Sequence, residues 1–393
     1  MRPLDGVRVL ELGQYIAAPY CAMMLADLGA EVIKIERPEV GDPRRSYDPL
    51  MESSTGAMSG GFLSYNRNKK SVTIELATEA GRYEYLELAD TADVVIENLR
   101  PGAVDRLGIG YETLRQRNSR LIYCAISGYG RLQTHRGEYA DRPAFDTAIQ
   151  AMGGMMAVTG EPGGAPLPTV TGFADVYTAV HGAVGVLAAL AGREKSGTGA
   201  FVDQSMYDSI ASLLERELML FDFTGQDRVR GVDRYSPLGA LRASDGYVAL
   251  ILPTEEMWHR LCRAIRRPDL MDHPDLKTTV GRAENFTSVI RPEAEKWTAM
   301  HSRREIVDLF ASFGLPAGEA QTIEEVYNCP HLSSRHMFLD ITDEHAGRRR
   351  MIRTPILIEG YDEPATASAP ALGEHNGEIL GREVFDAVET SIR

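Results

Sequence analysis

The chain has 393 residues, of which 44% are apolar and 25% are charged, a composition typical of a globular protein with two or three domains. Its 56 acidic and 42 basic side chains give a formal net charge of −14. This balance excludes a protein whose main role is to coat nucleic acid or an anionic membrane. We therefore expect no nucleic-acid partner and no membrane partner, and any anionic ligand must meet a local basic patch.

The sequence also indicates a compartment and a redox setting. No apolar run approaches the ~20 residues that span a bilayer, and the start, MRPLDGVRVLELG, predicts a strand rather than a signal peptide. These features predict a cytoplasmic protein. The cysteines are scattered without a CxxC pair, so we expect reduced thiols, no disulfide framework and no metal site.

Strand and helix patterns alternate along the first 130 residues. GVRVLELG is a β-branched run, IAAPYCAMMLADLG fits a helix, and AEVIKIERP is a second strand, which together predict a βαβ unit. The same alternation continues through SVTIEL, TEAGRYEYLELADTA, DVVIENL, GAVDRLGIGYETLRQRN and RLIYCAISGYG. The fold class predicted is α/β, with a Rossmann-like parallel sheet.

Further along, the pattern predicts an apolar helix in TVTGFADVYTAVHGAVGVLAAL, then a turn, a strand and a long helix in GREKSGTGAFVDQSMYDSIASLLERELML. The composition changes near residue 226. We predict a large Rossmann-like domain over residues 1–225, a smaller inserted α+β domain over 226–325, and a C-terminal segment, 326–393. That last segment has too few apolar residues for a core of its own and is expected to return to the large domain.

Basic side chains gather in the N-terminal part of this acidic chain. In open α/β sheets, ligands bind outside the carboxyl ends of the strands, where Arg37 and ENLRPG are expected to lie. No GxGxxG follows the first strand, which disfavours a dinucleotide cofactor. The set suits a ligand with several phosphates, such as coenzyme A. Each residue taken singly is more typical of a solvated surface, except that the strand-end position of Arg37 favours ligand binding. Its members are Arg37, Arg44, Arg45, Arg67, Lys69, Lys70, Arg100 and Arg106.

The motifs resemble, in order and over essentially the whole chain, the class III CoA-transferases of the formyl-CoA transferase and carnitine CoA-transferase type. The resemblance rests on MRPLDGVRVLELGQYIAAPYCAMMLADLGAEVIKIERPEVGD, NRNKKSVTIEL, ENLRPGAVDRLGIGY, SGYG, TGFADVYTAVHGAVGVLAAL and PALGEHNGEIL. It implies a large Rossmann-like domain made from both chain ends and an interlocked homodimer. It also implies transfer of CoA from an acyl-CoA to a small carboxylic acid, with the CoA thioester as substrate and no permanently bound cofactor.

The resemblance also assigns site residues. The family's nucleophile is an aspartate just before an apolar helix, and Asp175 matches it. Such a carboxylate forms a mixed anhydride and then an aspartyl-CoA thioester. The matching CoA contacts are Arg37, Leu76, Asn98, Leu99 and Arg106.

Without the resemblance, the local sequence favours a structural role for Asp175 as the cap of its helix. The two roles agree on one point, because a helix start favours a carboxylate anion by ~0.3–1 kcal/mol. Gly172 and Ala174 would leave room for substrate. Asp146 matches a position where related transferases place an acid near the reacting centre, and both a supporting role and an ordinary cap or loop role stay open.

Two alternatives remain at this stage. A 2-methylacyl-CoA racemase or epimerase shares the fold but needs an acid/base pair, and Phe145 stands where that group has a histidine. A non-catalytic CoA-binding protein would need the ligand contacts without Asp175.

The sequence does not name the donor or the acceptor. RYSPLGALRASDG lacks the glycine run of oxalate-handling members, and Ile16 replaces their glutamine, with Gln14 two residues earlier. We therefore expect larger or more apolar acids. A dicarboxylate could be held by arginines near the small domain, which are otherwise surface charges: Arg228, Arg230, Arg234 and Arg242.

Overall fold

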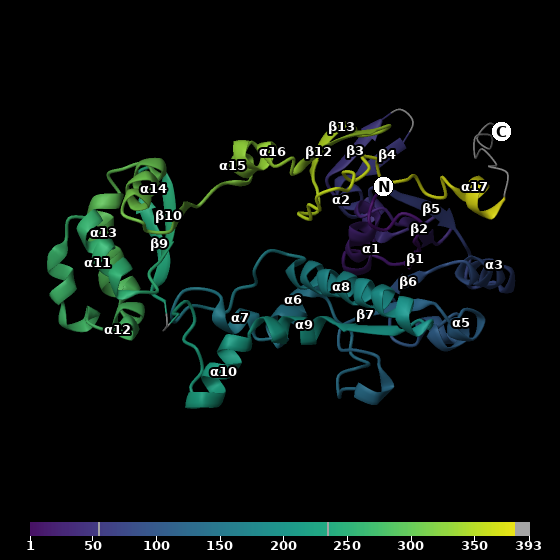
Figure 1. Ribbon diagram of the computed structural model, residues 1–393, viewed down its shortest axis with the longest axis horizontal. Coiled ribbons are helices and arrows are strands. Elements are labelled where there is room, and N and C mark those ends of the chain that lie inside the picture. The colour runs from purple at the N-terminus through teal and green to yellow at the C-terminus, as the bar shows by residue number, and fades with distance from the viewer. Residues whose placement is uncertain (54–55, 234–235, 382–393) are drawn as a thin grey trace, which may run out of the picture. The chain divides into compact units, whose positions relative to one another are not determined.

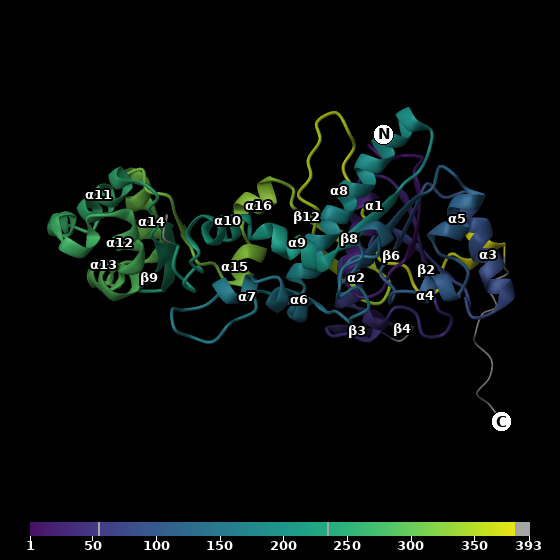
Figure 2. The same ribbon diagram turned by 90° about the horizontal axis from the view of Figure 1, so that it is seen from below.

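The computed structural model describes residues 1–53, 56–233 and 236–381. Contacts divide the chain into two units, shown as ribbons in Figures 1 and 2. Each unit buries an apolar core of its own. The first comprises Met1–Met155, Pro168–Leu214 and Ser333–Arg393, and the second comprises Met156–Leu167 and Glu215–Leu332.

A six-stranded parallel sheet forms the centre of the first unit. Its strands are β1 (Arg8–Leu12), β2 (Glu31–Glu36), β5 (Lys69–Thr73), β6 (Val94–Glu97), β7 (Ile122–Ser127) and β8 (Phe201–Ser205). The strand order β5-β2-β1-β6-β7-β8 places β1 between β2 and β6, so that the winding reverses there. This reversal opens a crevice beyond the carboxyl ends of β1 and β6. The predicted mixed α/β fold with a parallel sheet is confirmed.

Helices cover both faces of the sheet, which is why its strands β6 and β7 are buried along their whole length and are mainly apolar. On one face α1 (Ala17–Asp27) packs against α8 (Phe173–Ser196), and on the other α3 (Glu79–Asp90) packs against α5 (Tyr111–Arg117). The other helices and turns before residue 214 are η1 (Pro43–Ser46), α2 (Gly60–Asn66), α4 (Ala103–Arg106), η2 (Gln133–His135), α6 (Asp146–Met152), α7 (Met155–Val158) and α9 (Met206–Leu213).

Two predicted helices are each divided in the structure. Residues 102–118 form α4 and α5, because Gly108 adopts a φ of 69° and closes α4. The Gly108 N–H donates to the Asp105 carbonyl and the Ile109 N–H to the Val104 carbonyl, the pair of bonds that ends a helix in a Schellman motif. The helix predicted after β8 likewise divides into α9 and α10 (Glu215–Thr224).

Helix α8 corrects the expectation that no apolar run could span a bilayer. Its 24 residues are long and apolar enough to do so by length and composition. It packs against α1, α9, β7 and β8, and a core helix passes the same test.

The segment between β2 and β5 is more elaborate than the sequence suggested. After η1 it forms a hairpin, β3 (Leu50–Ser53) with β4 (Gly56–Ser59), and then α2. The C-terminal part of the chain supplies another hairpin, β12 (Phe338–Asp343) with β13 (Gly347–Ile352), and then α17 (Asn376–Leu380), which packs on β5. Figure 1 shows this yellow segment beside the purple N-terminal strands. The Asn376 Oδ1 atom accepts the Thr73 N–H at 2.8 Å.

The second unit pairs a small sheet with helices. Helix α11 (Glu255–Ala264) turns Trp258, Leu261 and Cys262 to the core, the i, i+3, i+4 spacing of a half-buried helix. The antiparallel sheet has the order β11-β10-β9. The remaining elements are β9 (Leu238–Ala243), β10 (Gly246–Ile251), η3 (Pro268–Asp272), η4 (Pro274–Leu276), α12 (Thr279–Glu284), η5 (Phe286–Ile290), α13 (Arg291–Thr298), α14 (Arg303–Ser312), β11 (Ala317–Glu319), α15 (Ile323–Tyr327) and α16 (Pro330–Ser334).

Candidate functional site

Asp175 lies in the first turn of α8 and is partly buried. It does not cap the helix, because the cap position belongs to Gly172, which has a φ of 86° and no side chain to offer. A Cβ on Gly172 would lie 3.2 Å from the Ile16 Cδ1 atom, so glycine permits the close approach of the loop after β1. Within the described ranges, no hydrogen bond reaches the Asp175 carboxylate.

Asp146, unlike Asp175, accepts hydrogen bonds at the start of α8. It is the first residue of α6 and is buried. Its Oδ1 atom accepts the Ala174 N–H at 2.7 Å, and its Oδ2 atom accepts from Gln150 Nε2 at 2.8 Å. Asp146 therefore satisfies one free N–H at the start of α8 from a neighbouring helix.

Gln150 is a site residue that the sequence motifs did not identify. It is fully buried, and its Oε1 atom accepts from both the N–H and the hydroxyl of Thr169 at 2.9 Å. Asp146 and Gln150 together fasten the chain that leads into α8. The available signal was their i, i+4 spacing on one helix, where such side chains meet.

The electrostatic setting of Asp175 is unfavourable to its charge. Burial and the nearby Asp146 carboxylate raise the pKa of Asp175 to about 7, against the opposing charge of Arg44. Burial thus outweighs the helix-start effect expected from the sequence. A carboxylate of higher pKa is more basic and more nucleophilic once ionised, and near neutral pH it still ionises in part.

Three aromatic rings lie together on loops near this site: Phe145 directly before α6, Tyr15 shortly before α1 and Tyr47 directly after η1. The Tyr15 ring meets the rings of Phe145 and Tyr47 edge-on, at centroid distances of 6.1 and 6.2 Å. Tyr15 has a φ of 65°, and its N–H donates to Asp42 Oδ1 at 3.2 Å. Phe145 leaves 69% of its surface exposed.

A pocket of about 500 Å³ opens at the carboxyl ends of β1, β2, β5 and β6. Three predicted CoA contacts line it: Arg37, Leu76 and Leu99. The Arg37 side chain is 70% exposed, and its Nε atom lies 3.9 Å from Glu75 Oε2. Leu76 and Leu99 pack partly against the core beneath the pocket.

The structure does not place Asn98 and Arg106 on the wall of this pocket. Asn98 forms a reciprocal pair with the main chain of Gln14, accepting its N–H at 2.9 Å and donating to its carbonyl at 2.8 Å. This pair joins the loops after β1 and β6 at the point where the sheet reverses. Arg106 is exposed at the end of α4, with its guanidinium beside Gly102.

Several of the basic residues are neither surface charges nor free to bind phosphate, which corrects both interpretations. Arg45 pairs with Glu36 at 2.6 Å, and Arg67 pairs with Asp27 at 2.6 Å. Lys69 is fully buried and pairs with Glu11 at 2.6 Å. Their charges are therefore committed to the fold.

Lys69 belongs to a buried charge cluster, defined as Glu11, Lys34, Glu36, Asp42 and Lys69. Lys34 Nζ contacts Glu11 Oε1 at 2.8 Å, the Gly13 carbonyl at 2.8 Å and Asp42 Oδ2 at 3.0 Å. Although burial opposes it, the carboxylates raise the pKa of Lys34 above its ordinary value. The cluster fixes the backbone at Gly13 and Asp42, which both line the pocket.

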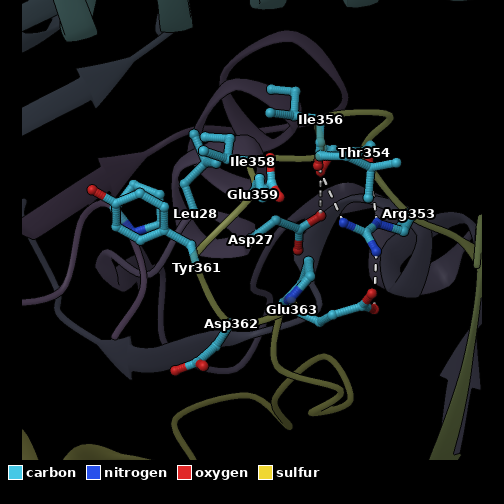
Figure 3. A pocket seen from close by; sticks show the side chains of 13 residues that line it. Asp27, Leu28, Arg353, Thr354, Ile356, Ile358, Glu359, Tyr361, Asp362 and Glu363 are labelled. Atoms are coloured by element: carbon cyan, nitrogen blue, oxygen red, sulfur yellow. Dashed lines mark hydrogen bonds and ion pairs between the residues drawn. The ribbon is translucent and has the colours of Figure 1, made fainter.

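Another pocket, of about 360 Å³, is lined by the loop 353–364 and the end of α1 (Figure 3). Its polar groups pair with one another: Arg353 with Glu363 at 3.0 Å, and the Thr354 hydroxyl with Asp27 Oδ2 at 3.1 Å. None of the predicted site residues lines it, so it is not the candidate site.

The arginines suggested for a dicarboxylate lie in the second unit. Arg228 pairs with Glu217, and Arg230 donates to the carbonyls of Ala157 and Gly164. Arg234 lies outside the described residues. Over the ranges that are described, no three His, Cys, Asp or Glu side chains come together to hold a metal ion.

Comparisons with known proteins agree over nearly the whole chain. The sequence model described as CoA-transferase family III matches residues 4–376. The chain is 37% identical to a succinyl-CoA:mesaconate CoA-transferase of Haloarcula hispanica, over 97% of this chain and 96% of that protein. It is 32% identical to a succinate–glutarate CoA-transferase of Agrobacterium fabrum, over 96% and 95%. A crystal structure of a CaiB/BaiF family protein from Brucella suis is similar with a TM-score of 0.85, at 32% identity, covering 97% of this chain and 99% of that one.

Proposed function

Because the chain belongs to CoA-transferase family III, an enzyme family whose substrates are CoA thioesters, we propose that it carries CoA from an acyl-CoA to a free carboxylic acid through Asp175. One observation carries this proposal. Asp175 is a partly buried carboxylate without a hydrogen-bond partner in the described chain, and it stands on a helix start that Asp146 and Gln150 hold in place.

The reaction needs an activated carboxylate but no ATP. The Asp175 carboxylate attacks the thioester carbonyl, which forms a mixed anhydride and releases the CoA thiolate. The thiolate attacks the Asp175 carbonyl carbon, the donor acid leaves as a carboxylate, and an aspartyl-CoA thioester remains. The acceptor carboxylate attacks that thioester, giving a second anhydride and the thiolate. The thiolate then takes the acceptor acyl group, and Asp175 is regenerated as a carboxylate.

Two features of the site favour this chemistry. A pKa raised to about 7 makes Asp175 a stronger nucleophile than an ordinary aspartate. Both Asp146 oxygens already accept hydrogen bonds, so we propose that Asp146 orients the start of α8 and does not itself react. Gln150 supports it in the same role.

We propose that CoA occupies the pocket beyond β1, β2, β5 and β6. Arg37 would meet phosphate there, since its exposed guanidinium is only loosely paired with Glu75. Leu76 and Leu99 would contact the apolar parts of the ligand. Arg106, at the end of α4, would bind a further phosphate. Asn98 would act through its bonds to Gln14, which fix the loop between the pocket and Ile16.

The names of the relatives point to a first donor to try. The Haloarcula hispanica enzyme is named for succinyl-CoA as its donor, and the Agrobacterium fabrum enzyme is named for succinate as one of its acids. We therefore propose succinyl-CoA as the donor of this chain, with the acceptor acid to be found among small free acids.

The test is CoA exchange between succinyl-CoA and a panel of free acids, with thioester products read by mass spectrometry. Asp175→Ala should reduce the rate by about 10³-fold or more, because it removes the carboxylate that forms the anhydride. Asp308→Ala, which removes an exposed aspartate of α14, is the matched control and should exchange at the wild-type rate. Exchange that survives in Asp175→Ala would rule out the proposed mechanism.

The racemase reaction makes a different prediction. It requires exchange of the α-hydrogen with deuterated water in the absence of an acceptor acid. Phe145 cannot take a proton, and it occupies the place of the required base. Deuterium incorporation by the wild-type protein would favour a racemase over the transferase.

We further propose that the protein is an interlocked homodimer. Helix α10 leaves apolar side chains exposed that a partner would cover, and an apolar face of this kind commonly marks an interface. They are Leu218, Met219, Phe221 and Phe223. Light scattering should give a dimer mass for the wild type, and a monomer mass would contradict the proposal.

A further inference from the structure

The surroundings of Arg44 differ from those of the adjacent Arg45, which is ion-paired. Arg44 lies in η1 and is half-buried. Its Nε atom donates to the Gly61 carbonyl at 2.8 Å, and its guanidinium faces the Tyr65 ring at 4.9 Å and the Tyr47 ring at 5.5 Å. A Cβ on Gly61 would lie 2.9 Å from Arg44 Nη2, so glycine leaves the space for this side chain.

The guanidinium is held but not neutralised. The adjacent Arg45 pairs with Glu36 at 2.6 Å, whereas no carboxylate in the described chain lies within the 4.0 Å of an ion pair from Arg44. The Nη1 and Nη2 atoms of Arg44 accordingly make no hydrogen bond to the described protein. Such a fork matches the two oxygens of a carboxylate.

Ring contacts connect Arg44 to the loops around the proposed nucleophile. The Tyr47 ring beside its guanidinium meets the Tyr15 ring, and the Tyr15 ring meets Phe145, the residue directly before Asp146. The charge of Arg44 also opposes the rise in the pKa of Asp175 that burial and Asp146 cause. No ion pair or hydrogen bond joins Arg44 to Asp175 among the described residues, so neither group neutralises the other. Asp42 fixes this arrangement, because its Oδ1 atom accepts the N–H groups of both Arg44 and Tyr15.

We infer that Arg44 binds the second carboxylate of a dicarboxylic substrate while the first carboxylate, or its thioester, meets Asp175. This inference rests on the proposed transferase function and names its substrate class. One arginine serves both halves of the reaction, because the donor acid leaves the place that the acceptor then enters. The rings of Tyr47 and Tyr65 and the Gly61 carbonyl restrict the Arg44 side chain before a ligand binds, so that little conformational freedom is lost on binding.

The experiment compares acids that differ only in the second carboxylate. Donors are succinyl-CoA and butyryl-CoA, and acceptors are glutarate and valerate. The full-length wild type is compared with Arg44→Met, Arg44→Lys and the control Arg115→Met, which removes an exposed arginine of α5. We expect Arg44→Met to lower kcat/KM for the dicarboxylic substrates about 10- to 100-fold more than for the monocarboxylic ones, with Arg44→Lys intermediate.

A second measurement does not depend on turnover. The dissociation constants of glutarate and valerate, determined by NMR titration, should differ in the wild type and converge in Arg44→Met. Equal losses for all four substrates, or a loss confined to the KM of every CoA thioester, would overturn the inference and assign Arg44 to general electrostatics or to a CoA phosphate. The transferase proposal would survive that result, whereas a wild type that transfers CoA between no pair of acids would end both proposals.

Discussion

Among the regions of the first unit that bury charged side chains, the buried charge cluster and the start of α8 treat those charges in opposite ways. In the buried charge cluster, each charge lies within ion-pairing distance of an opposite one, as Lys34 does with Glu11 and Asp42. At the start of α8, Asp175 has no such partner and carries a pKa of about 7. The fold thus pairs the charges of the cluster with opposite charges, whereas at the start of α8 the carboxylate that we propose to react has neither an ion pair nor a hydrogen bond in the described chain.

This difference predicts that mutations in the two regions change the stability of the protein in opposite directions. When one member of a buried ion pair is removed by mutation, the other member stays buried without compensation for its desolvation penalty. An unpaired buried charge already carries that penalty, so its removal relieves the native state. Stability measurements should therefore separate the two regions by sign.

The largest effect is expected in the cluster. Lys34→Met should lower the free energy of unfolding by about 3–5 kcal/mol, because Glu11 and Asp42 lose their shared cation. Arg115→Met, which breaks an exposed pair with Glu112, should change it by less than about 1 kcal/mol. Denaturant titrations of both variants measure the contrast, and a Lys34→Met protein as stable as Arg115→Met would contradict it.

Asp175→Asn should act in the opposite direction. The folded-state pKa of about 7 lies above the ordinary value, so between pH ~4 and 7 the native state keeps a proton that the unfolded chain releases. This carboxyl therefore lowers stability progressively as the pH rises through that window. Asp175→Asn should be about 1–3 kcal/mol more stable than the wild type at pH 8 and no more stable near pH 4.

Thermal unfolding at the two pH values provides the measurement. The control is Asp308→Asn, which changes a side chain that is 75% exposed and should behave as the wild type at both. A stability gain for Asp175→Asn that is the same at pH 4 and pH 8 would mean that packing, not charge, is responsible.

Gln150→Ala should affect catalysis through position alone. Loss of its bonds to Asp146 and Thr169 frees the chain before α8, and we expect kcat to fall about 10-fold with little change in KM for the CoA thioester. Steady-state kinetics measure the split. A rise in KM with an unchanged kcat would place Gln150 in substrate binding instead.

The smallest effects are shifts of the pH profile. In the wild type, kcat/KM should rise through an apparent pKa of about 7 as Asp175 ionises. Asp146→Asn removes a like charge and should move this midpoint to lower pH, whereas Arg44→Met removes the opposing cation and should move it to higher pH. Two shifts of the same sign would show that the midpoint belongs to another group.

The sequence was a good guide to the sheet and a poor one to the charges. The parallel core was predictable because β-branched runs alternate with amphipathic helices at short spacing. The ion pairs were not, because Lys69 meets Glu11 from 58 residues away and only the sheet brings β5 and β1 into register around β2. The basic tract NRNKK therefore looked like a surface feature.

The site shows the same division. Asp175 could be identified by resemblance to a family, yet its raised pKa could not, since burial depends on what packs over the start of α8. Gln150 belongs to no recognisable motif, and its role depends on Thr169, which the fold brings within hydrogen-bonding distance of it. Arg44 and Arg45 are adjacent in the sequence, and only the fold distinguishes the paired one from the one available to a ligand.

The central claim is that Asp175 carries the acyl group and then CoA, and trapping tests it most directly. The protein is incubated with succinyl-CoA, treated with hydroxylamine or borohydride, digested and examined by mass spectrometry. We predict a hydroxamate or a reduced side chain at Asp175, absent when succinyl-CoA is omitted. Active exchange of CoA with an unmodified Asp175, or with the adduct on another residue, would contradict the account.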